Sequence, residues 1–319
     1  MTAGYRDNAE QLAAELDRLD QLIRRRLSAP EQAAAARAAY VTREEVEELL
    51  GGGHGSGSGG DRELDALDAE IETRVAHGLA EGTWLALPVL GRLFGLSAAE
   101  LQAVVVCLAP ELRRGYDRVY AYLQDDITRK RPSADLVLRL LWPDERRRWA
   151  ARELLCDTAP LLRASILRPV GDPHSPSGCT DLARFLTLDP RITAFLLGSQ
   201  QLDASLRGLV RFHSPVDGDA PPALAEGMLR LTAHHWSGED RPALVFRMHG
   251  PGDTADLAGA VCAGLGVPLL DLDAGELGGE PEELLRAFFR EGLLLRAGVH
   301  LAAPEALPPA ARRTLRTRR

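Results

Sequence analysis

The stretch Gly250 to Leu277 reads GPGDTADLAGAVCAGLGVPLLDLDAGEL and carries the clearest fold signal in the chain. A short apolar run, Ala243 to Phe246, precedes it. The glycine-rich turn His249 to Thr254 follows, and apolar residues then repeat at helical spacing from Leu257 to Leu265. This order predicts a β-strand, a tight turn and an α-helix.

A loop that holds nucleotide phosphates has the pattern G-x-x-x-x-G-K-[ST], in which the lysine contacts the phosphates and the hydroxyl binds Mg²⁺. When the pattern is anchored on Gly252, Asp253 replaces the lysine and Thr254 supplies the hydroxyl; anchored on Gly250, it places Asp256 at the lysine position. Two like charges about 4 Å apart repel by about 4 kcal/mol at an effective dielectric constant near 20, so this carboxylate disfavours a triphosphate. The candidate residues of this degenerate phosphate loop are Gly250, Pro251, Gly252, Asp253 and Thr254.

Further strand and helix signals follow the loop. The stretch Gly266 to Asp273 predicts a second short strand, Glu282 to Phe289 an amphipathic helix, and Gly298 to Leu301 a third strand. The predicted fold class is therefore α/β, with three parallel strands and their helices behind a mainly helical N-terminal region.

These motifs resemble the opening of an AAA+ ATPase, in which a phosphate loop, a helix and LG-x-P lead to the second strand. The later AGVHLAAPEAL, residues 297–307, is similar to the Walker B strand of that family. In this alignment Ala302 occupies the Mg²⁺-associated Asp position and Ala303 the catalytic Glu position. The resemblance implies ATP and Mg²⁺ as cofactors, but two alanines can neither hold the metal nor polarise a water, so we expect binding to be weak or absent, and we assign no catalytic residue and no metal ligand.

The resemblance also implies a parallel sheet with strand order 5-1-4-3-2. The chain ends soon after the third strand, so the first three strands must pair as 1-3-2 or leave an open slot. We expect the chain to be the N-terminal part of a longer tandem ATPase, or a truncated paralogue of one.

The chain divides by composition into five parts. Two amphipathic helices are predicted in residues 1–50, and the Gly/Ser-rich residues 51–60 are typical of a flexible linker. A helical, winged-helix-like domain is predicted over 61–214, a hinge and helix over 215–240, and the partial phosphate-loop domain over 241–319.

We expect the region from Asp61 to about Phe212 to be helical almost throughout, and two helix-start signals support this. Ser97 and Glu100 form a capping-box pattern, and Ser133 precedes another helical run. A small β-wing is expected at residues 166–173, whereas 182–188 has apolar residues at helical spacing. The string YLQDDITRKRPS, residues 122–133, resembles the variant winged-helix region that precedes the ATPase modules of a bacterial AAA+ family associated with phage-tail-like contractile injection systems.

Composition excludes several classes of protein. The chain has 319 residues, 45% of them hydrophobic and 26% charged, without a signal-peptide pattern or an apolar stretch of membrane-spanning length, so we expect a cytoplasmic protein with no membrane partner. Its net charge of −8 disfavours nucleic acid as a partner. The four cysteines lack the C-x-x-C spacing of a zinc site, and Cys107 is expected in the core.

Other polar clusters have simpler structural interpretations. Asp125 and Asp126 are expected to bond nearby arginines such as Arg129 at a helix end, and residues 129–131 and 146–148 to form solvated basic faces. Adjacent His234 and His235 lack spaced metal-ligand partners. A Ser/His/Asp arrangement is not indicated either, because the G-x-S-x-G elbow is missing.

Two functions remain open. The first is an ATP-binding protein by descent that does not hydrolyse ATP and serves assembly or remodelling of an injection particle, with other AAA+ subunits or particle components as partners. The alternative is a non-catalytic protein-interaction or adaptor module, and a winged-helix DNA binder is less favoured than either.

Overall fold

The computed structural model describes residues 3–28, 43–50, 60–171, 180–215, 226–230, 232 and 254–316. The chain forms two compact units, Met1–Ser199 and Gln200–Arg319, and each is described by itself. Within the described residues, no helix combines the length and the apolar character needed to cross a membrane.

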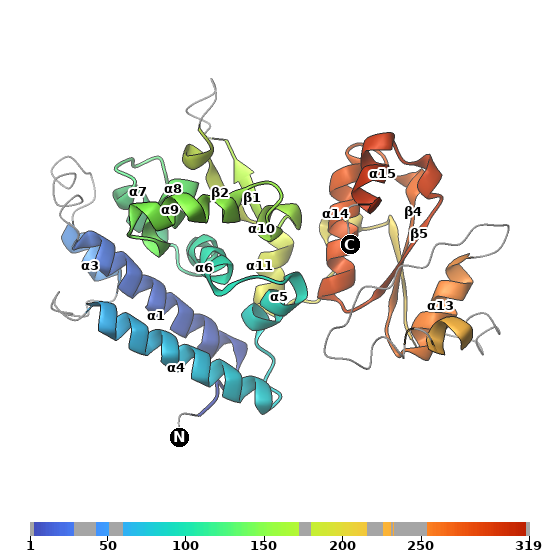
Figure 1. The fold of residues 1–319 in the computed structure, drawn as a ribbon, viewed down its shortest axis with the longest axis horizontal. Helices are drawn as coiled ribbons and strands as arrows, with labels where there is room; N and C mark the ends of the chain where they lie inside the picture. The colour runs from blue at the N-terminus through green and yellow to red at the C-terminus, as the bar shows by residue number, and fades with distance from the viewer. Residues whose placement is uncertain are drawn as a thin grey trace. The chain divides into compact units, whose positions relative to one another are not determined.

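The N-terminal unit is mainly helical (Figure 1). Its described elements, in chain order, are α1 (Asn8–Leu27), α3 (Arg43–Leu49), α4 (Gly60–Ala80), α5 (Ala86–Phe94), α6 (Ala98–Leu112), α7 (Tyr116–Leu123), α8 (Ala134–Leu141), α9 (Glu145–Ala151), η1 (Arg152–Leu155), α10 (Pro160–Arg163), β1 (Leu167–Val170), η2 (Asp181–Ala183), β2 (Phe185–Leu188) and α11 (Pro190–Leu196).

Helices α1 and α4 lie side by side along one edge of this unit (Figure 1). The side chain of Asp7 caps α1 by accepting a hydrogen bond from the backbone N–H of Glu10, and the leucines of α1 face inward. Arg18 pairs with Asp68, and Glu10 pairs with Arg74. Residue numbers rise along one helix as they fall along the other, so the two helices are antiparallel.

Helix α6 is the buried centre of the N-terminal unit. The predicted capping box of Ser97 and Glu100 is present, and Ser133 caps α8 as predicted. The predicted burial of Cys107 is also confirmed, and burial raises the pKa of its thiol. Tyr120 from α7 donates a hydrogen bond of 2.7 Å to the carbonyl oxygen of Val106, which satisfies a buried hydroxyl.

The predicted wing is confirmed at its strand, β1, whereas residues 172–173 of its predicted turn lie outside the described residues. Strands β1 and β2 pair antiparallel, with Leu167 opposite Leu188, and an isolated bridge joins Ser133 to Phe185. The helical interpretation of residues 182–188 is wrong, because only η2 precedes β2. The apolar residues of β2 are buried against α6 and β1, and this tertiary pairing overrides the local helical spacing.

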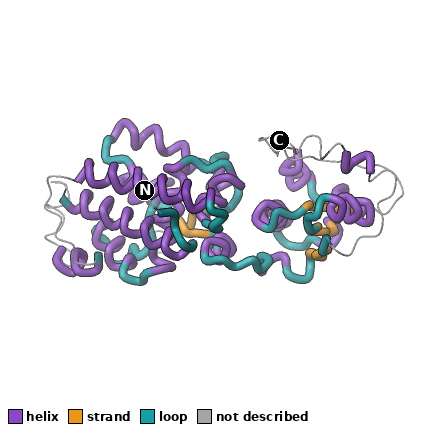
Figure 2. Tube along the Cα trace, turned by 90° about the horizontal axis from the view of Figure 1, so that it is seen from below, coloured by secondary structure: helices purple, strands orange, loops and turns teal. Residues whose placement is uncertain are grey.

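The C-terminal unit is a small α/β structure. Its described elements, in chain order, are η3 (Ala204–Leu206), β3 (Val210–His213), α13 (Thr254–Gly264), β4 (Leu269–Asp273), η4 (Ala274–Glu276), α14 (Pro281–Leu294), β5 (Gly298–Ala302), η5 (Pro304–Ala306) and α15 (Pro309–Arg316). Helices lie on either side of its strands (Figure 2).

The described sheet has the order β3-β4-β5 and is mixed rather than all parallel. The predicted second and third strands, β4 and β5, form and pair parallel, with Leu270 opposite Val299. The remaining described strand, β3, lies in a region predicted to be helical and pairs antiparallel with β4. The sequence around Val210 carries no hint of a partner about sixty residues later, and the predicted first strand at residues 243–246 lies outside the described residues.

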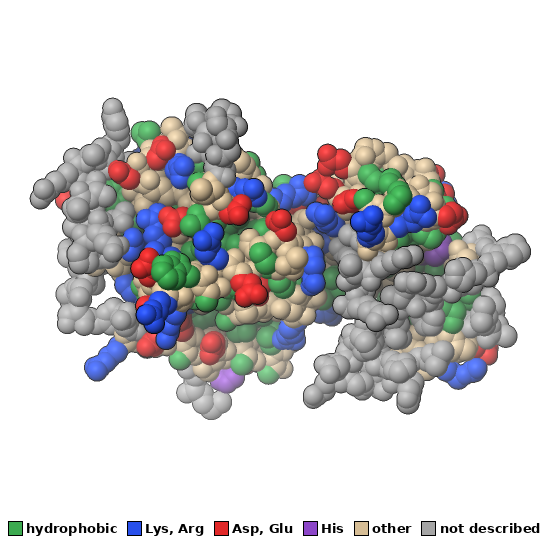
Figure 3. Space-filling view, turned by 45° about the horizontal axis from the view of Figure 1, so that its top comes forward, with side chains coloured by type: hydrophobic (Ala, Val, Ile, Leu, Met, Phe, Trp, Pro, Cys, Tyr) green, Lys and Arg blue, Asp and Glu red, His purple; other side chains and the backbone are tan. Residues whose placement is uncertain are grey.

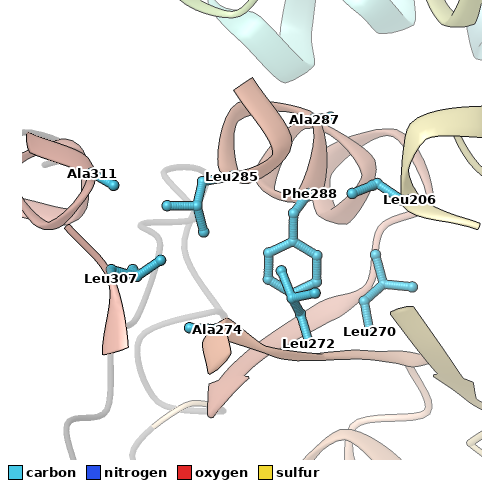
Figure 4. Packing of buried hydrophobic residues seen from close by; sticks show 9 residues of the cluster. All are labelled: Leu206, Leu270, Leu272, Ala274, Leu285, Ala287, Phe288, Leu307 and Ala311. Carbon is cyan, nitrogen blue, oxygen red and sulfur yellow. The ribbon is translucent and has the colours of Figure 1, made fainter. Parts of the chain in front are cut away.

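The core of this unit lies between β4 and α14 (Figure 4). Side chains alternate along a strand, so Leu270 and Leu272 point to one face, where they meet Phe288 of α14. The buried cluster consists of Leu206, Leu270, Leu272, Ala274, Leu285, Ala287, Phe288, Leu307 and Ala311. The opposite face of β4 is thereby left to carry Asp271 and Asp273.

A buried ion pair fastens η3 to α14. Arg290 Nη2 lies 2.7 Å from Asp203 Oδ2, and the Arg290 side chain is 1% exposed. Burial opposes ionisation of Asp203, but hydrogen bonds from Ser205 and the charge of Arg290 outweigh it and lower the pKa of this carboxyl group.

Candidate functional site

A pocket opens on the polar face of the C-terminal sheet, at the carboxyl ends of the parallel strands β4 and β5. The N-terminus of α13 and the start of β3 complete its wall, and its volume is about 400 Å³. In open α/β sheets ligands bind outside the carboxyl ends of the strands. We call it the Thr254 pocket, and its lining residues are Leu209, Arg211, Thr254, Ala255, Asp271, Asp273, Glu276, His300 and Ala302.

The strand register brings the polar side chains of the pocket into one row. Asp271 of β4 is directly opposite Arg211 of β3 on one side and His300 of β5 on the other. Directly opposed residues point to the same face of a sheet. Arg211, Asp271 and His300 therefore share the face that carries the pocket.

Hydrogen bonds link three of these residues in series. His300 Nδ1 lies 2.7 Å from Asp271 Oδ1, and His300 Nε2 lies 2.8 Å from Thr254 Oγ1. A carboxylate can only accept, so Nδ1 must carry a proton, and in the neutral ring Nε2 then accepts the hydrogen bond that Thr254 donates. The second oxygen of Asp271 faces His213 Nε2 at 3.9 Å.

The pocket wall is acidic on balance. The described lining residues include three acidic residues, Asp271, Asp273 and Glu276, and one arginine, Arg211. The N-terminus of α13 would attract an anion, because a helix N-terminus carries partial positive charge. This attraction is limited to groups near the first turn of the helix. The three acidic residues that line the same pocket oppose a triphosphate, which carries several negative charges.

The predicted phosphate-loop and Walker B residues have different outcomes. Gly250, Pro251, Gly252 and Asp253 lie outside the described residues. Thr254 is the first residue of α13, where it lines the pocket. Ala302, the last residue of β5, also lines the pocket, and Ala303 follows it in a left-handed conformation with φ 46°. Thr254 and Ala302 are thus brought to one cavity although 48 positions separate them in the sequence.

The predicted residues do not fit a Mg²⁺ site. Ala302 offers only a methyl group, and the Thr254 hydroxyl is already bonded to His300. Across the part of the chain that the structure describes, no group of three or more His, Cys, Asp or Glu side chains is arranged to hold a metal ion. His234 and His235 lie outside that part.

Reasoning from the sequence missed Asp271 and His300 as site residues. They are 29 positions apart and meet because each is the third residue of a five-residue parallel strand. The LDLD pattern, residues 270–273, was the available signal, since alternation puts both carboxylates on one face of a strand.

The contact expected between Asp126 and Arg129 is present in the N-terminal unit. Asp126 accepts hydrogen bonds from the backbone and hydroxyl of Thr128 and pairs with Arg129 at 3.5 Å, as expected for a helix end. Acidic and basic side chains are interspersed over the visible face of this unit rather than gathered by sign (Figure 3). Helix α10, which immediately precedes the wing, is only four residues long, and its Leu161 is fully buried.

The helices followed by an antiparallel β1–β2 wing define the N-terminal unit as a winged-helix structure. A family model described as a variant winged helix domain matches residues 1–210. The chain belongs to this family. Neither a curated protein nor a solved structure matches it at the level required for a confident relationship.

Proposed function

We propose that the chain couples a variant winged-helix domain to a descendant of an AAA+ nucleotide-binding module that does not hydrolyse ATP. One observation carries the proposal: Ala302 lines the Thr254 pocket at the end of β5, the place where the resemblance puts the Mg²⁺-associated carboxylate. A methyl group cannot hold Mg²⁺, which requires oxygen ligands.

The other side chains of the pocket support the same proposal. The Thr254 hydroxyl, which would bind Mg²⁺ in an active phosphate loop, is instead bonded to His300. The carboxylates of Asp271, Asp273 and Glu276 disfavour a polyphosphate. The chain's one lysine, Lys130, belongs to the other compact unit.

The proposed cellular role is assembly or remodelling of a phage-tail-like contractile injection system. It rests on the YLQDDITRKRPS string, residues 122–133, which lies within the region matched by the winged-helix family. The chain would then act with protein partners, either AAA+ subunits or particle components, and ATP hydrolysis would be supplied by a partner. If the role is correct, deleting the gene in its host reduces the yield of intact particles; an unchanged yield would argue for an unrelated adaptor.

Steady-state ATP hydrolysis by the purified full chain tests the enzymatic part. We expect phosphate release with Mg-ATP to stay at the rate of a protein-free blank. The opposite result would be Mg²⁺-dependent turnover that is lost in Thr254→Val but kept in Thr73→Val. Thr73 is a suitable control because its exposed hydroxyl bonds only within its own helix, to the carbonyl oxygen of Ala69.

A further inference from the structure

The hydrogen-bonded series in the Thr254 pocket has the order of a nucleophilic relay. A hydroxyl, Thr254 Oγ1, contacts the imidazole Nε2 of His300, and the Nδ1 of the same ring contacts the carboxylate of Asp271. In serine hydrolases the base takes the hydroxyl proton through Nε2 while the carboxylate fixes the tautomer through Nδ1. Both distances, 2.8 and 2.7 Å, lie within the range of such contacts.

In such a relay the base and the carboxylate should be buried, and the nucleophile should be accessible to the substrate. Asp271 and His300 have side chains only 10% and 12% exposed, so their geometry is held by the sheet. Thr254 and Ala255 are intermediate in exposure and stand at the cavity wall. A cavity of about 400 Å³ is in the range that takes a small molecule.

We propose that Thr254, His300 and Asp271 form a hydrolytic site for small carboxylic esters that are uncharged or cationic. Thr254 is the nucleophile, His300 the general base and then general acid, and Asp271 the residue that positions His300. The substrate class follows from the wall, since Asp273 and Glu276 repel an anionic ester. The proposal does not depend on descent from a nucleotide-binding module.

The reaction balances with water as the co-reactant. Thr254 Oγ1 attacks the ester carbonyl carbon as its proton passes to His300 Nε2, and the carbonyl oxygen becomes an oxyanion. Arg211, which also lines the pocket, contributes positive charge toward that oxygen. The intermediate expels the alkoxide, which takes the proton from His300 and leaves as an alcohol. A water then attacks the acyl-threonine, gives its proton to His300, and releases the carboxylic acid as Thr254 regains its proton.

Hydrolysis of p-nitrophenyl acetate by the purified full chain tests the site, together with a fluorophosphonate label mapped by peptide mass spectrometry. We expect label on Thr254 and a rate that falls by at least about tenfold in Thr254→Val. Thr254→Ser, whose hydroxyl is less hindered, should hydrolyse faster than the wild type. Thr73→Val makes the same change at an exposed position of α4 and should hydrolyse at the wild-type rate.

Two results would overturn the proposal: an unchanged rate in a folded Thr254→Val protein, or label found only at other residues. Folding of each variant is checked by its thermal midpoint. Should Thr254→Val fail to fold, the labelled position in the wild type and in Thr254→Ser decides. ATP hydrolysis is measured separately, so the outcome for the ester leaves the proposed absence of ATPase activity to its own test.

Discussion

Glu10 joins the first turn of α1 to its surroundings through two arginines. Its carboxylate accepts hydrogen bonds from the backbone and side chain of Arg6 and from Arg74 of α4. The backbone hydrogen bond of Arg6 is the largest cause, followed by the Arg74 side chain, and together they lower the pKa of Glu10 to about 2. The ionised form is therefore favoured by the folded state.

Glu10 should make the stability of the N-terminal unit depend on pH in acid. A carboxyl group whose folded pKa is depressed contributes stability that is present above its unfolded pKa of 4.5 and is lost as the pH falls toward about 2. Urea unfolding of wild type and Glu10→Gln at several acidic pH values measures this. We expect the difference between the two proteins to shrink as the pH falls, and a constant difference would contradict the assignment.

The residues of the candidate site could be predicted only in part. Thr254 and Ala302 follow from motif spacing, because each lies at a fixed distance along the chain from a glycine turn or a strand end. Asp271 and His300 do not, since their contact is fixed by the register of two parallel strands. Periodicity predicts the face on which a side chain lies, but it does not predict which residue lies beside it on the next strand.

At the scale of elements, β4 and α14 are held together by Phe288, whose ring is fully buried against Leu270 and Leu272. Truncating such a side chain loses the favourable free energy of transferring it from water to the core, and it leaves a cavity. We expect Phe288→Ala to lower the free energy of unfolding of the C-terminal unit by about 3–5 kcal/mol.

Phe212→Ala is the matched control. Phe212 belongs to β3 in the same unit, but it is 60% exposed. Its truncation should change the free energy of unfolding by only about 0.5 kcal/mol. Chemical denaturation of both variants makes the comparison, and equal losses would mean that the core does not lie between β4 and α14.

Long periodic elements could be predicted from the sequence, whereas the four-residue strands β2 and β3 were predicted to be helical. The caps at Ser97 and Ser133 mark α6 and α8 locally, because each bond closes within three residues. Strands β2 and β3 are four residues long, and each is stabilised by a partner distant in sequence. Four residues are too few for period-2 alternation to compete with a helical pattern.

Residues 200–214 follow directly after the N-terminal unit in the sequence, and they belong to the C-terminal compact unit. The winged-helix family match extends to residue 210. Leu206 nevertheless belongs to the C-terminal core, Asp203 pairs with Arg290, and Val210 lies opposite Leu272. The packing places this segment in the C-terminal unit.

Truncated chains test this boundary. A fragment of residues 1–199 should unfold with the same midpoint as one of residues 1–214, because the extra segment has its partners elsewhere. A fragment of residues 200–319 should be more stable than one of residues 215–319, which lacks β3 and leaves Arg290 buried without Asp203. Stabilisation of 1–199 by the added segment would contradict the boundary.

We propose that the Thr254 pocket does not bind Mg-triphosphate. The thermal unfolding midpoint of the full chain, measured with and without millimolar Mg-ATP, tests this most directly. A ligand that binds only the folded state adds about 2.7 kcal/mol at a hundred times its dissociation constant. We predict no shift in the midpoint; a shift that requires Mg²⁺ and disappears in Thr254→Val but persists in Thr73→Val would contradict the account.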